Sequence, residues 1–246
     1  MYTDIHSHIL PGVDDGPKDL EDSLKLLKQA VSEGTGNIIA TPHFYALHHD
    51  LEGRLELIDT VFSEFVAAAK KEFPNINFKQ GFEVRYFNNI SKCDALERLC
   101  IKGSRTILLE LGYEPITDKM VSEIIELFYN GFNVILAHIE RYYKIKGFSK
   151  LIEVVEGGFA KAQVNASAFF EGHFSRSAVK LLKNNYISFI AGDMHSVDVR
   201  PSKLKDAFIF IAKKFGEDTS IRLNKNAFLL FSGEDKGETV VKDVLF

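Results

Sequence analysis

Seven short runs of strand-forming residues alternate with amphipathic, helix-forming stretches along this 246-residue sequence. The runs read YTDIHSH, NIIATPH, INFKQGFEV, TILLELG, NVILAHIE, FAKAQVNAS and YISFIAGDMH. A helix between successive strands favours parallel pairing, because a long crossover is needed to bring the chain back in the same direction. The alternation therefore predicts an α/β fold with helices outside a parallel sheet, which is either open and doubly wound or closed into a barrel.

The first helical stretch, LEDSLKLLKQAVSEG, follows Asp19, a residue type that commonly caps helices. Its apolar residues recur at helical spacing and predict one buried face, made of Leu20, Leu24, Leu27 and Val31. After Asp218 the sequence predicts a terminal helix and a loosely held end, GEDKGETVVKDVLF. No Pro/Ser-rich linker interrupts the alternation, so we expect residues 1–246 to form a single domain.

The composition indicates a globular protein and argues against some classes of ligand. Hydrophobic residues make up 46% of the chain and charged residues 26%, which is ordinary for a globular domain. The net charge of −4 and the lack of a long basic run argue against nucleic-acid binding, although a phosphorylated ligand stays open. Neither a signal-peptide pattern nor a run of about 18 apolar residues occurs. Cys93 and Cys100 lie in a segment that we expect to be helical, and they form no disulfide framework. We expect a cytoplasmic protein without membrane insertion.

The end of each strand-forming run carries a polar side chain, and most of these can bind a metal. They are His6, His8, His43, Glu83, Glu110, His138, Asn165, Asp193 and His195. From His8 to Asp193 the intervals are 35, 40, 27, 28, 27 and 28 residues, or about one β/α unit each. The carboxyl ends of parallel barrel strands converge on one mouth, so we expect these side chains to meet there.

The residue types at these strand ends indicate a metal site. His6 and His8 lie two residues apart and can face the same side of a strand, and Asp193 and His195 repeat the spacing. Imidazole and carboxylate are ligands that Zn, Mn and Fe accept in hydrolytic sites. Five histidines, two glutamates and one or two aspartates exceed what one ion uses, which predicts two or three ions with a bridging carboxylate.

Several of these features have ordinary structural explanations when taken alone. One His-x-His pair, or one glutamate at a strand end, is more often a structural feature than a ligand. Asp14 and Asp15 compete for one ligand role, and the other is expected to cap the turn before Gly16. The three remaining histidines are interpreted as exposed loop residues: His48, His49 and His173.

The motifs DIHSHILPGVDDG, TPH, GFEVRY, LLELG, LAHIERY, QVNAS and GDMHSVDVRP together resemble the PHP (polymerase and histidinol phosphatase) superfamily. More narrowly, they are similar to its branch of bacterial manganese-dependent protein-tyrosine phosphatases associated with capsule and exopolysaccharide synthesis. The resemblance implies a distorted seven-stranded (β/α)7 TIM-like barrel of the PHP type. Gly192 and Met194 depart from the family pattern, where Ser and Ala are usual.

The resemblance also implies a site with three ions and their ligands. One ion would be held by His6, His8, Glu83 and Asp193, a second by Glu83, Glu110 and His138, and a third by Asp15, His43 and His195. Manganese is the implied metal, with Fe and Zn left open. Bound ions lower the pKa of coordinated water toward ~7, and the implied mechanism is attack of the resulting hydroxide on a phosphoryl group.

Two arginines next to the ligand motifs are candidates for holding phosphate. Arg141 follows His138 by three residues, and Arg200 follows His195 by five. A guanidinium can donate two hydrogen bonds to phosphate oxygens, a role that Lys fills less well. Neither cysteine lies in the Cys-x5-Arg context of a thiol phosphatase, so no cysteine nucleophile is expected.

The function that this resemblance implies is hydrolysis of phosphotyrosine in a protein, expected to be the tail of a bacterial tyrosine kinase of capsule or exopolysaccharide synthesis. Phe44, Tyr45 and Tyr113 follow ligand candidates and could flank a phenyl ring, or they could pack the rim of the barrel. Two alternatives stay open at this point. One is a small-molecule phosphomonoesterase such as a histidinol phosphatase, and the other is a metal-binding regulatory module with reduced catalysis. The oligomeric state also stays open.

Overall fold

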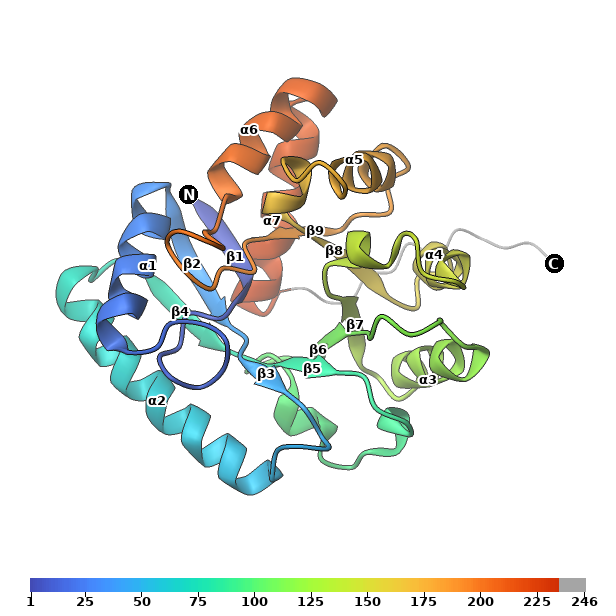
Figure 1. Cartoon of the computed structure of the whole chain (residues 1–246), viewed down its shortest axis with the longest axis horizontal. Helices are drawn as coiled ribbons and strands as arrows, with labels where there is room; N and C mark the ends of the chain where they lie inside the picture. Colours follow the sequence, from blue (N-terminus) through green and yellow to red (C-terminus); the bar gives the residue numbers. More distant parts are fainter. Residues whose placement is uncertain (235–246) are drawn as a thin grey trace.

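The computed structural model describes residues 1–234 of the chain (Figure 1). Its strands are β1 (Tyr2–Ser7), β2 (Thr35–Ala40), β3 (His43–Phe44), β4 (Asn77–Gln80), β5 (Glu83–Arg85), β6 (Thr106–Glu110), β7 (Asn133–Leu136), β8 (Lys161–Asn165) and β9 (Phe189–Ala191). The α-helices are α1 (Leu20–Ser32), α2 (Leu51–Glu72), α3 (Asp118–Tyr129), α4 (Phe148–Glu156), α5 (Ser175–Lys183), α6 (Leu204–Phe215) and α7 (Glu217–Ser232). Short 3-10 turns are η1 (Ile90–Lys92), η2 (Leu96–Leu99), η3 (Ile139–Tyr142) and η4 (Ala166–Phe169).

All strand pairing within the two sheets is parallel, which confirms the predicted α/β class. One sheet has the order β1-β2-β4, and the other has the order β3-β5-β6-β7-β8-β9. The six-stranded sheet curls, with helices α3, α4 and α5 on its outer side (Figure 1). Two of the predicted runs are divided: residues 41–42 separate β2 from β3, and residues 81–82 separate β4 from β5. At the first break Pro42 has no N–H to donate to a neighbouring strand.

The first and last strands lie side by side. The backbone N–H of Asp193 donates to the carbonyl of His6 at 2.8 Å, and the N–H of His8 donates to the carbonyl of Met194 at 3.0 Å. Asp4 lies wholly buried next to this junction, and its Oδ1 accepts the N–H of Gly192 at 2.8 Å. These bonds connect the two ends of the strand sequence.

The buried side chains form two hydrophobic cores. The larger one lies between the strands and the outer helices. The smaller one lies inside the curled sheets and contains Ile5, Ile39, Leu108, Ile135, Phe189, Ala227 and Leu230. Ala227 and Leu230 come from α7, which packs against β1 and β9. The terminal helix expected from the sequence is therefore present, and it closes one end of the inner core.

Two local expectations are corrected. Asp19 caps α1 as predicted, because its side chain accepts the N–H of Asp22, but the buried face of α1 is made of Ser23, Leu26, Leu27 and Ala30. Leu20 is 40% exposed. The rest of the predicted face is confirmed, because Leu27 is buried and Leu24 and Val31 pack against the larger core. The region of Cys93 and Cys100 forms 3-10 turns rather than a helix. Most of the predicted loose end, residues 235–246, lies outside the described residues.

Strand β1 carries a bulge next to its histidines. Asp4 pairs with Ile38 and Ser7 pairs with Ala40, so three steps along β1 match two steps along β2. A bulge changes the direction of the side chains that follow it. Ile5 therefore belongs to the inner core while the adjacent His6 points into the polar cluster at the strand ends.

The loop after β1 folds back over the end of the strand. A Cβ atom on Gly16 would lie 2.1 Å from the carbonyl oxygen of His8, which is backbone and cannot move aside. Only glycine permits this close approach, and the approach brings Asp14 and Asp15 over the strand end.

No helix among residues 1–234 is long and apolar enough to cross a membrane.

We predict that Gly16→Ala lowers the free energy of unfolding by about 1–3 kcal/mol, because the added methyl group forces the loop off the end of β1. The matched control is Gly172→Ala, since a Cβ there meets nothing within 4 Å. The control should stay within about 0.5 kcal/mol of the original chain. Urea unfolding in the presence of a chelator measures both variants, and equal stability of the two would contradict the packing argument.

Candidate metal centre

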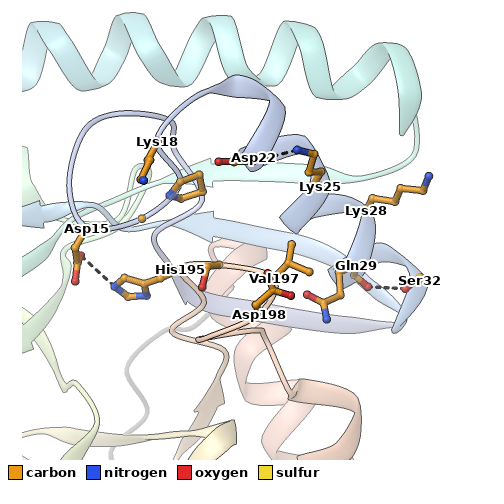
Figure 2. Close-up of a pocket in the computed structure, with 13 residues that line it drawn as sticks. Asp15, Lys18, Asp22, Lys25, Lys28, Gln29, Ser32, His195, Val197 and Asp198 are labelled. Carbon is orange, nitrogen blue, oxygen red and sulfur yellow. Dashed lines mark hydrogen bonds and ion pairs between the residues drawn. The ribbon is translucent and has the colours of Figure 1, made fainter.

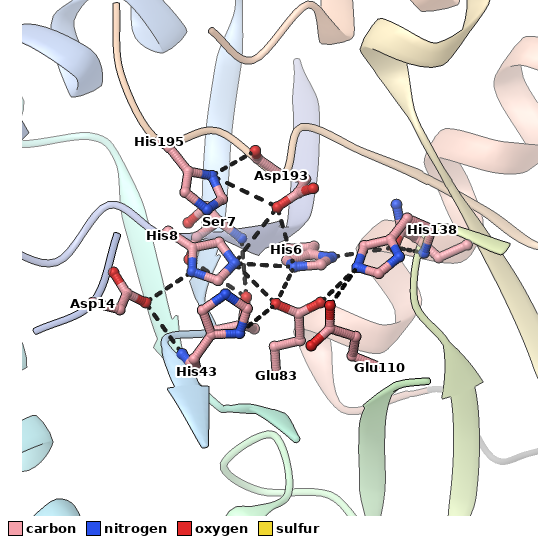
Figure 3. A network of polar contacts seen from close by, with 12 residues as sticks. His6, Ser7, His8, Asp14, His43, Glu83, Glu110, His138, Asp193 and His195 are labelled. Carbon is pink, nitrogen blue, oxygen red and sulfur yellow. Dashed lines mark hydrogen bonds and ion pairs between the residues drawn. The ribbon is translucent and has the colours of Figure 1, made fainter. Parts of the chain in front are cut away.

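The predicted strand-end ligands meet at one place, with Glu83 at their centre (Figure 3). Glu83 Oε2 lies 3.3 Å from His6 Nε2, 3.1 Å from His8 Nε2 and 3.0 Å from His43 Nδ1. Its other oxygen, Oε1, lies 2.8 Å from His138 Nε2. A single buried carboxylate at the start of β5 thus touches imidazoles from three other strand ends.

The other predicted ligands surround this centre. Asp193 Oδ1 lies 3.5 Å from both His6 Nε2 and His8 Nε2. Glu110 Oε1 lies 3.7 Å from the His138 ring. The remaining contacts involve Asp15, whose Oδ1 lies 3.1 Å from His195 Nε2 and 3.5 Å from His43 Nε2.

Three groups of these side chains have donor atoms within 4.8 Å of one another. They are His8, Asp15, His43 and His195; His6, His8 and Asp193; and His43, Glu83 and Glu110. The first group contains the whole ligand set implied for the third ion, with His8 added. The second contains the set for the first ion without Glu83. The last has His43 where the resemblance implies His138, although His138 also reaches Glu83 and Glu110.

The donor geometry fits ions better than it fits hydrogen bonds between the side chains. His43 Nδ1 and His195 Nε2 are buried and lie close to carboxylate oxygens, yet neither makes a hydrogen bond of acceptable geometry. Donor atoms that approach one another without aligning are expected where each is aimed at a shared point. Imidazole and carboxylate together suit Mn, Fe and Zn.

The side chains of the cluster shift one another's pKa values. Burial opposes ionisation of Glu83, but His6, His138 and His43 outweigh it and hold the pKa of Glu83 well below its usual range. Burial likewise opposes a charge on His8, yet hydrogen bonds to Asp14 and Glu83 raise its pKa well above the ordinary value. Protons on imidazole compete with metal ions for the same nitrogen atoms, so metal binding at this cluster releases protons.

Two members of the cluster have pKa values shifted the other way. Burial raises the pKa of Glu110, and the nearby charge of Glu83 adds to that shift. Burial, followed by the neighbouring charge of Arg141, lowers the pKa of His138 to about 4. His138 is therefore a neutral imidazole at neutral pH, which is the form that binds a metal.

The buried ligand candidates are oriented by partners that the sequence reading did not identify as functional. Gln163 Oε1 lies 3.2 Å from His6 Nδ1 and accepts the backbone N–H of His138. The hydroxyl of Tyr142 lies 3.2 Å from His138 Nδ1. Partners on the second ring nitrogen set the tautomer and orientation of a ligating histidine. Gln163 lies two residues before Asn165, and this same-face spacing was the available signal.

Asp14 has the capping role considered for one aspartate of the pair. Its Oδ1 accepts the N–H of Gly16 at 3.0 Å, while its Oδ2 lies 2.8 Å from His8 Nδ1. The same oxygen also accepts the backbone N–H of His43. Asp14 therefore orients two histidines from behind, and Asp15 is the aspartate that reaches the cluster.

Two ligand candidates have unusual backbone conformations. His138 has φ of 33° and Asp193 has φ of 48°, in the left-handed region that residues with a Cβ rarely adopt. Each follows the end of a strand, and the left-handed turn directs its side chain into the cluster. Such conformations cost about 1–3 kcal/mol each and occur often at functional sites.

Arg141 and Arg200 converge on one oxygen of Asp193. The Nη2 atom of each arginine donates to Asp193 Oδ2 at 2.7 Å, and the amide of Asn165 donates to the same oxygen at 2.6 Å. Asp193 thereby connects the histidine cluster to both predicted phosphate-binding arginines. Another arginine, Arg85, lies 3.2 Å from Glu110 Oε2, a pairing that was not predicted.

The two departures from the family pattern have visible consequences next to Asp193. A Cβ on Gly192 would lie 2.3 Å from Asp4 Oδ2, so glycine allows the close junction of β1 and β9. Met194 is fully buried in the larger core. Neither departure removes a candidate ligand.

Glu140 is buried nearby with one oxygen unpartnered, and burial raises its pKa to about 8.

A cavity of about 780 Å³ lies between α1 and the loop that follows β9 (Figure 2). Asp15 and His195 lie at one end of the cavity, and Lys25 and Lys28 line the part formed by α1. The candidate metal centre therefore borders a space large enough for a small ligand.

The remaining predicted side chains lie at the edge of the site. His48 and His173 are exposed, as expected, while His49 is half-buried and accepts the backbone N–H of Tyr45. Phe44 is buried and cannot contact a ligand's ring, which corrects its proposed role. The ring of Tyr45 stacks on His43, with centroids 4.9 Å apart, and Tyr113 is exposed.

The chain is similar to known proteins over most of its length. The family model described as "Capsular polysaccharide synthesis, CpsB/CapC" matches residues 2–230. The tyrosine-protein phosphatase CpsB of Streptococcus agalactiae serotype III is 30% identical over 234 residues, covering 89% of this chain and 93% of the relative. The putative tyrosine-protein phosphatase CapC of Staphylococcus aureus is 34% identical over 212 residues, covering 83% and 81%.

The chain is also similar to a solved structure. It comes from a study of YwqE of Bacillus subtilis and CpsB of Streptococcus pneumoniae, which its description calls unique metal-dependent tyrosine phosphatases. The structures superpose with a TM-score of 0.80 at 25% identity over 94% of each chain. With a family model covering most of its length and relatives at 30% identity or more, the chain belongs to the CpsB/CapC family of capsular polysaccharide synthesis.

Proposed function

We propose that this chain is a metal-dependent protein-tyrosine phosphatase, a phosphoric monoester hydrolase. The observation that carries the proposal is the convergence of nine imidazole and carboxylate ligand candidates next to two arginines, in a chain whose relatives are tyrosine phosphatases. The proposed ligands are His6, His8, Asp15, His43, Glu83, Glu110, His138, Asp193 and His195. When bound, divalent ions at such a site activate water at neutral pH and neutralise phosphoryl oxygens.

The side chains around the ligands have separate tasks in this proposal. Arg141 and Arg200 bind the phosphoryl oxygens through charge-assisted hydrogen bonds, and Asp193 holds both guanidinium groups in place beside the site. Gln163 and Asp14 hold histidine rings in the orientation that ligation requires. Because Arg141 and Arg200 are held in place before the reaction, they stabilise the charge that develops on the phosphoryl group.

We also propose that the whole chain is one PHP-type domain with seven strand positions. β2 with β3, and β4 with β5, each count as one interrupted strand, and the contact of β1 with β9 would close the ring. The larger core runs through residues from Ile9 to Leu223, which supports a single domain.

The finer identity of the substrate and metal is also proposed. The proposed substrate is a phosphotyrosine protein, which the names of the relatives support, and more narrowly the tail of a tyrosine kinase of capsular polysaccharide synthesis, the pathway in the family's description. Manganese is the proposed metal, because an imidazole-rich donor set favours transition metals over Mg²⁺. The cytoplasmic location stays a prediction from the sequence.

The first prediction for this function concerns metal dependence. Exhaustive dialysis against a chelator should abolish hydrolysis of a phosphotyrosine peptide, and Mn²⁺ should restore it better than Mg²⁺. Glu83→Gln should lower the bound metal measured by elemental analysis, because Glu83 touches four of the histidines. His48→Ala, at an exposed position outside the cluster, is the matched control and should keep its metal. Full activity in dialysed, metal-free protein would contradict the proposal.

A second prediction tests the arginines. Arg141→Ala and Arg200→Ala should each lower kcat/KM by roughly 10²-fold or more, since each removes a donor aimed at developing phosphoryl charge. Metal content should stay near that of the original chain. Arg222→Ala, at an exposed position on α7, is the matched control and should keep its kinetics. An arginine variant with unchanged kcat/KM would lose its proposed role.

The third prediction concerns the leaving group. Phosphotyrosine releases a phenolate whose conjugate acid has a pKa of about 10, far below that of a serine alkoxide. We expect kcat/KM for a phosphotyrosine peptide to exceed that for the matched phosphoserine peptide by at least roughly tenfold, or about 1.4 kcal/mol. Steady-state kinetics on both peptides and on histidinol phosphate measure this. A clear preference for histidinol phosphate would favour the small-molecule alternative.

A further inference from the structure

A second cavity, of about 610 Å³, lies directly beside the two arginines. Its polar lining includes Arg141, Asn165 and Arg200, which meet at Asp193 Oδ2, and also carboxylates such as Glu171 and Asp198. The volume falls within the range of about 300–1,000 Å³ that is usual for small-molecule sites. A phosphoryl group held by the arginines would therefore have open space next to it for the group to which it is esterified.

Five apolar side chains from two separate loops line part of this cavity. The turn after β8 contributes Phe170 and Phe174, and the loop after β9 contributes Val197, Val199 and Pro201. Phe170 is 49% exposed and Val199 is 82% exposed. Large apolar side chains that stay exposed around a polar centre commonly mark a binding surface.

Phe170 is held in place but keeps part of its surface free. Its ring meets the ring of Phe210 on α6 in an edge-to-face arrangement, with centroids 6.0 Å apart. That contact orients the phenyl group, and the exposed part of Phe170 lines the cavity. A second aromatic ring can pack there by offset or edge contact, the arrangements that aromatic pairs prefer.

The aromatic residues that follow His43 and Glu110 offer less to a substrate ring. Phe44 is buried, and Tyr45 already stacks on His43. Tyr113 is exposed and lies near Arg141, but it lines neither of the two cavities described here. The arginines, the open volume and the free apolar surface occur together only in the cavity beside Phe170, among those described above.

We propose that this cavity, named here the Phe170 cavity, binds the phenyl ring of phosphotyrosine, with Phe170 and Val199 as the contacting side chains. The inference rests on the proposed phosphatase function and adds to it the place where the enzyme distinguishes aryl from alkyl phosphates. The arginines hold the phosphoryl group, and the wall between η4 and the loop after β9 holds the ring.

Binding of two stable phosphonates to the manganese-loaded protein tests the inference without turnover. Calorimetry should show that phenylphosphonate binds at least threefold more tightly than methylphosphonate to the original chain. Phe170→Ala should lose most of that preference, since an aromatic contact accounts for roughly a threefold to tenfold difference in binding. Methylphosphonate should bind Phe170→Ala as it binds the original chain, because the arginines are untouched.

Three further variants separate the possible outcomes. Val199→Ser should reduce the phenyl preference, and because Val199 is 82% exposed this change is not expected to disturb folding. Leu47→Ala, at an 89% exposed position after β3, is the matched control and should keep the preference. Loss of the preference in Tyr113→Ala, with retention in Phe170→Ala and Val199→Ser, would overturn the assignment in favour of Tyr113.

The same preparations distinguish failure of this inference from failure of the proposed function. A chain that binds phenylphosphonate through Phe170 but does not hydrolyse phosphotyrosine peptides would keep the cavity assignment and lose the phosphatase. Hydrolysis of phosphotyrosine peptides with an unchanged KM in Phe170→Ala and Val199→Ser would keep the phosphatase and overturn the cavity assignment.

Discussion

The carboxylate of Asp193 is the interaction on which the arrangement of the site depends. One of its oxygens faces His6 and His8, and the other accepts hydrogen bonds from Arg141 and Arg200. These partners come from three different strand ends. Asp193 can reach all of them because β9 lies against β1 and because the residue turns into the left-handed region. The junction of β1 with β9 and the chemistry of the centre therefore depend on the same residue.

This arrangement concentrates charge in a part of the molecule where charge is costly. Glu83 and Asp193 are buried, and ionised carboxylates in such surroundings need partners of opposite charge or bound cations. Histidines supply part of that compensation, and burial keeps the pKa of His138 low enough for it to stay neutral. The hydrophobic cores on either side of the strands supply the stability against which this cost is set.

Much of this site could be predicted from the sequence because it depends on a regular feature. Parallel strands separated by helices bring their carboxyl ends together, so one polar residue per unit, from His8 to Asp193, indicates one site. The same regularity explains why His43 and Glu83 were predicted correctly to lie close together despite an interval of 40 residues. The alternation of strands and helices also predicted the parallel pairing.

The features that escaped prediction depend on contacts between distant residues. Ile5 and His6 both point inward because β1 has a bulge, and no local sequence pattern predicts that bulge. The role of Gln163 as a shared partner of His6 and His138 depends on packing between β1, β7 and β8. Phe170 reads as an ordinary apolar residue in the sequence, and only the fold places it beside the arginines. The buried positions of Ser23 and Ala30 on α1 were missed because small residues carry no hydrophobic signal.

The position of α7 has a consequence for the way the protein is made. Ala227 and Leu230 fill the inner core together with Ile5 and Ile39, so residues more than 180 positions apart must meet before that core is complete. Ribosomes deliver the chain from its amino terminus, and the strands that carry the ligands emerge before the helix that packs beneath them. Contacts between such distant segments form slowly, because a long loop must close first. During synthesis the strands expose apolar surface until α7 has been made and has packed against them. Chaperones that cover such surface prevent aggregation during this interval.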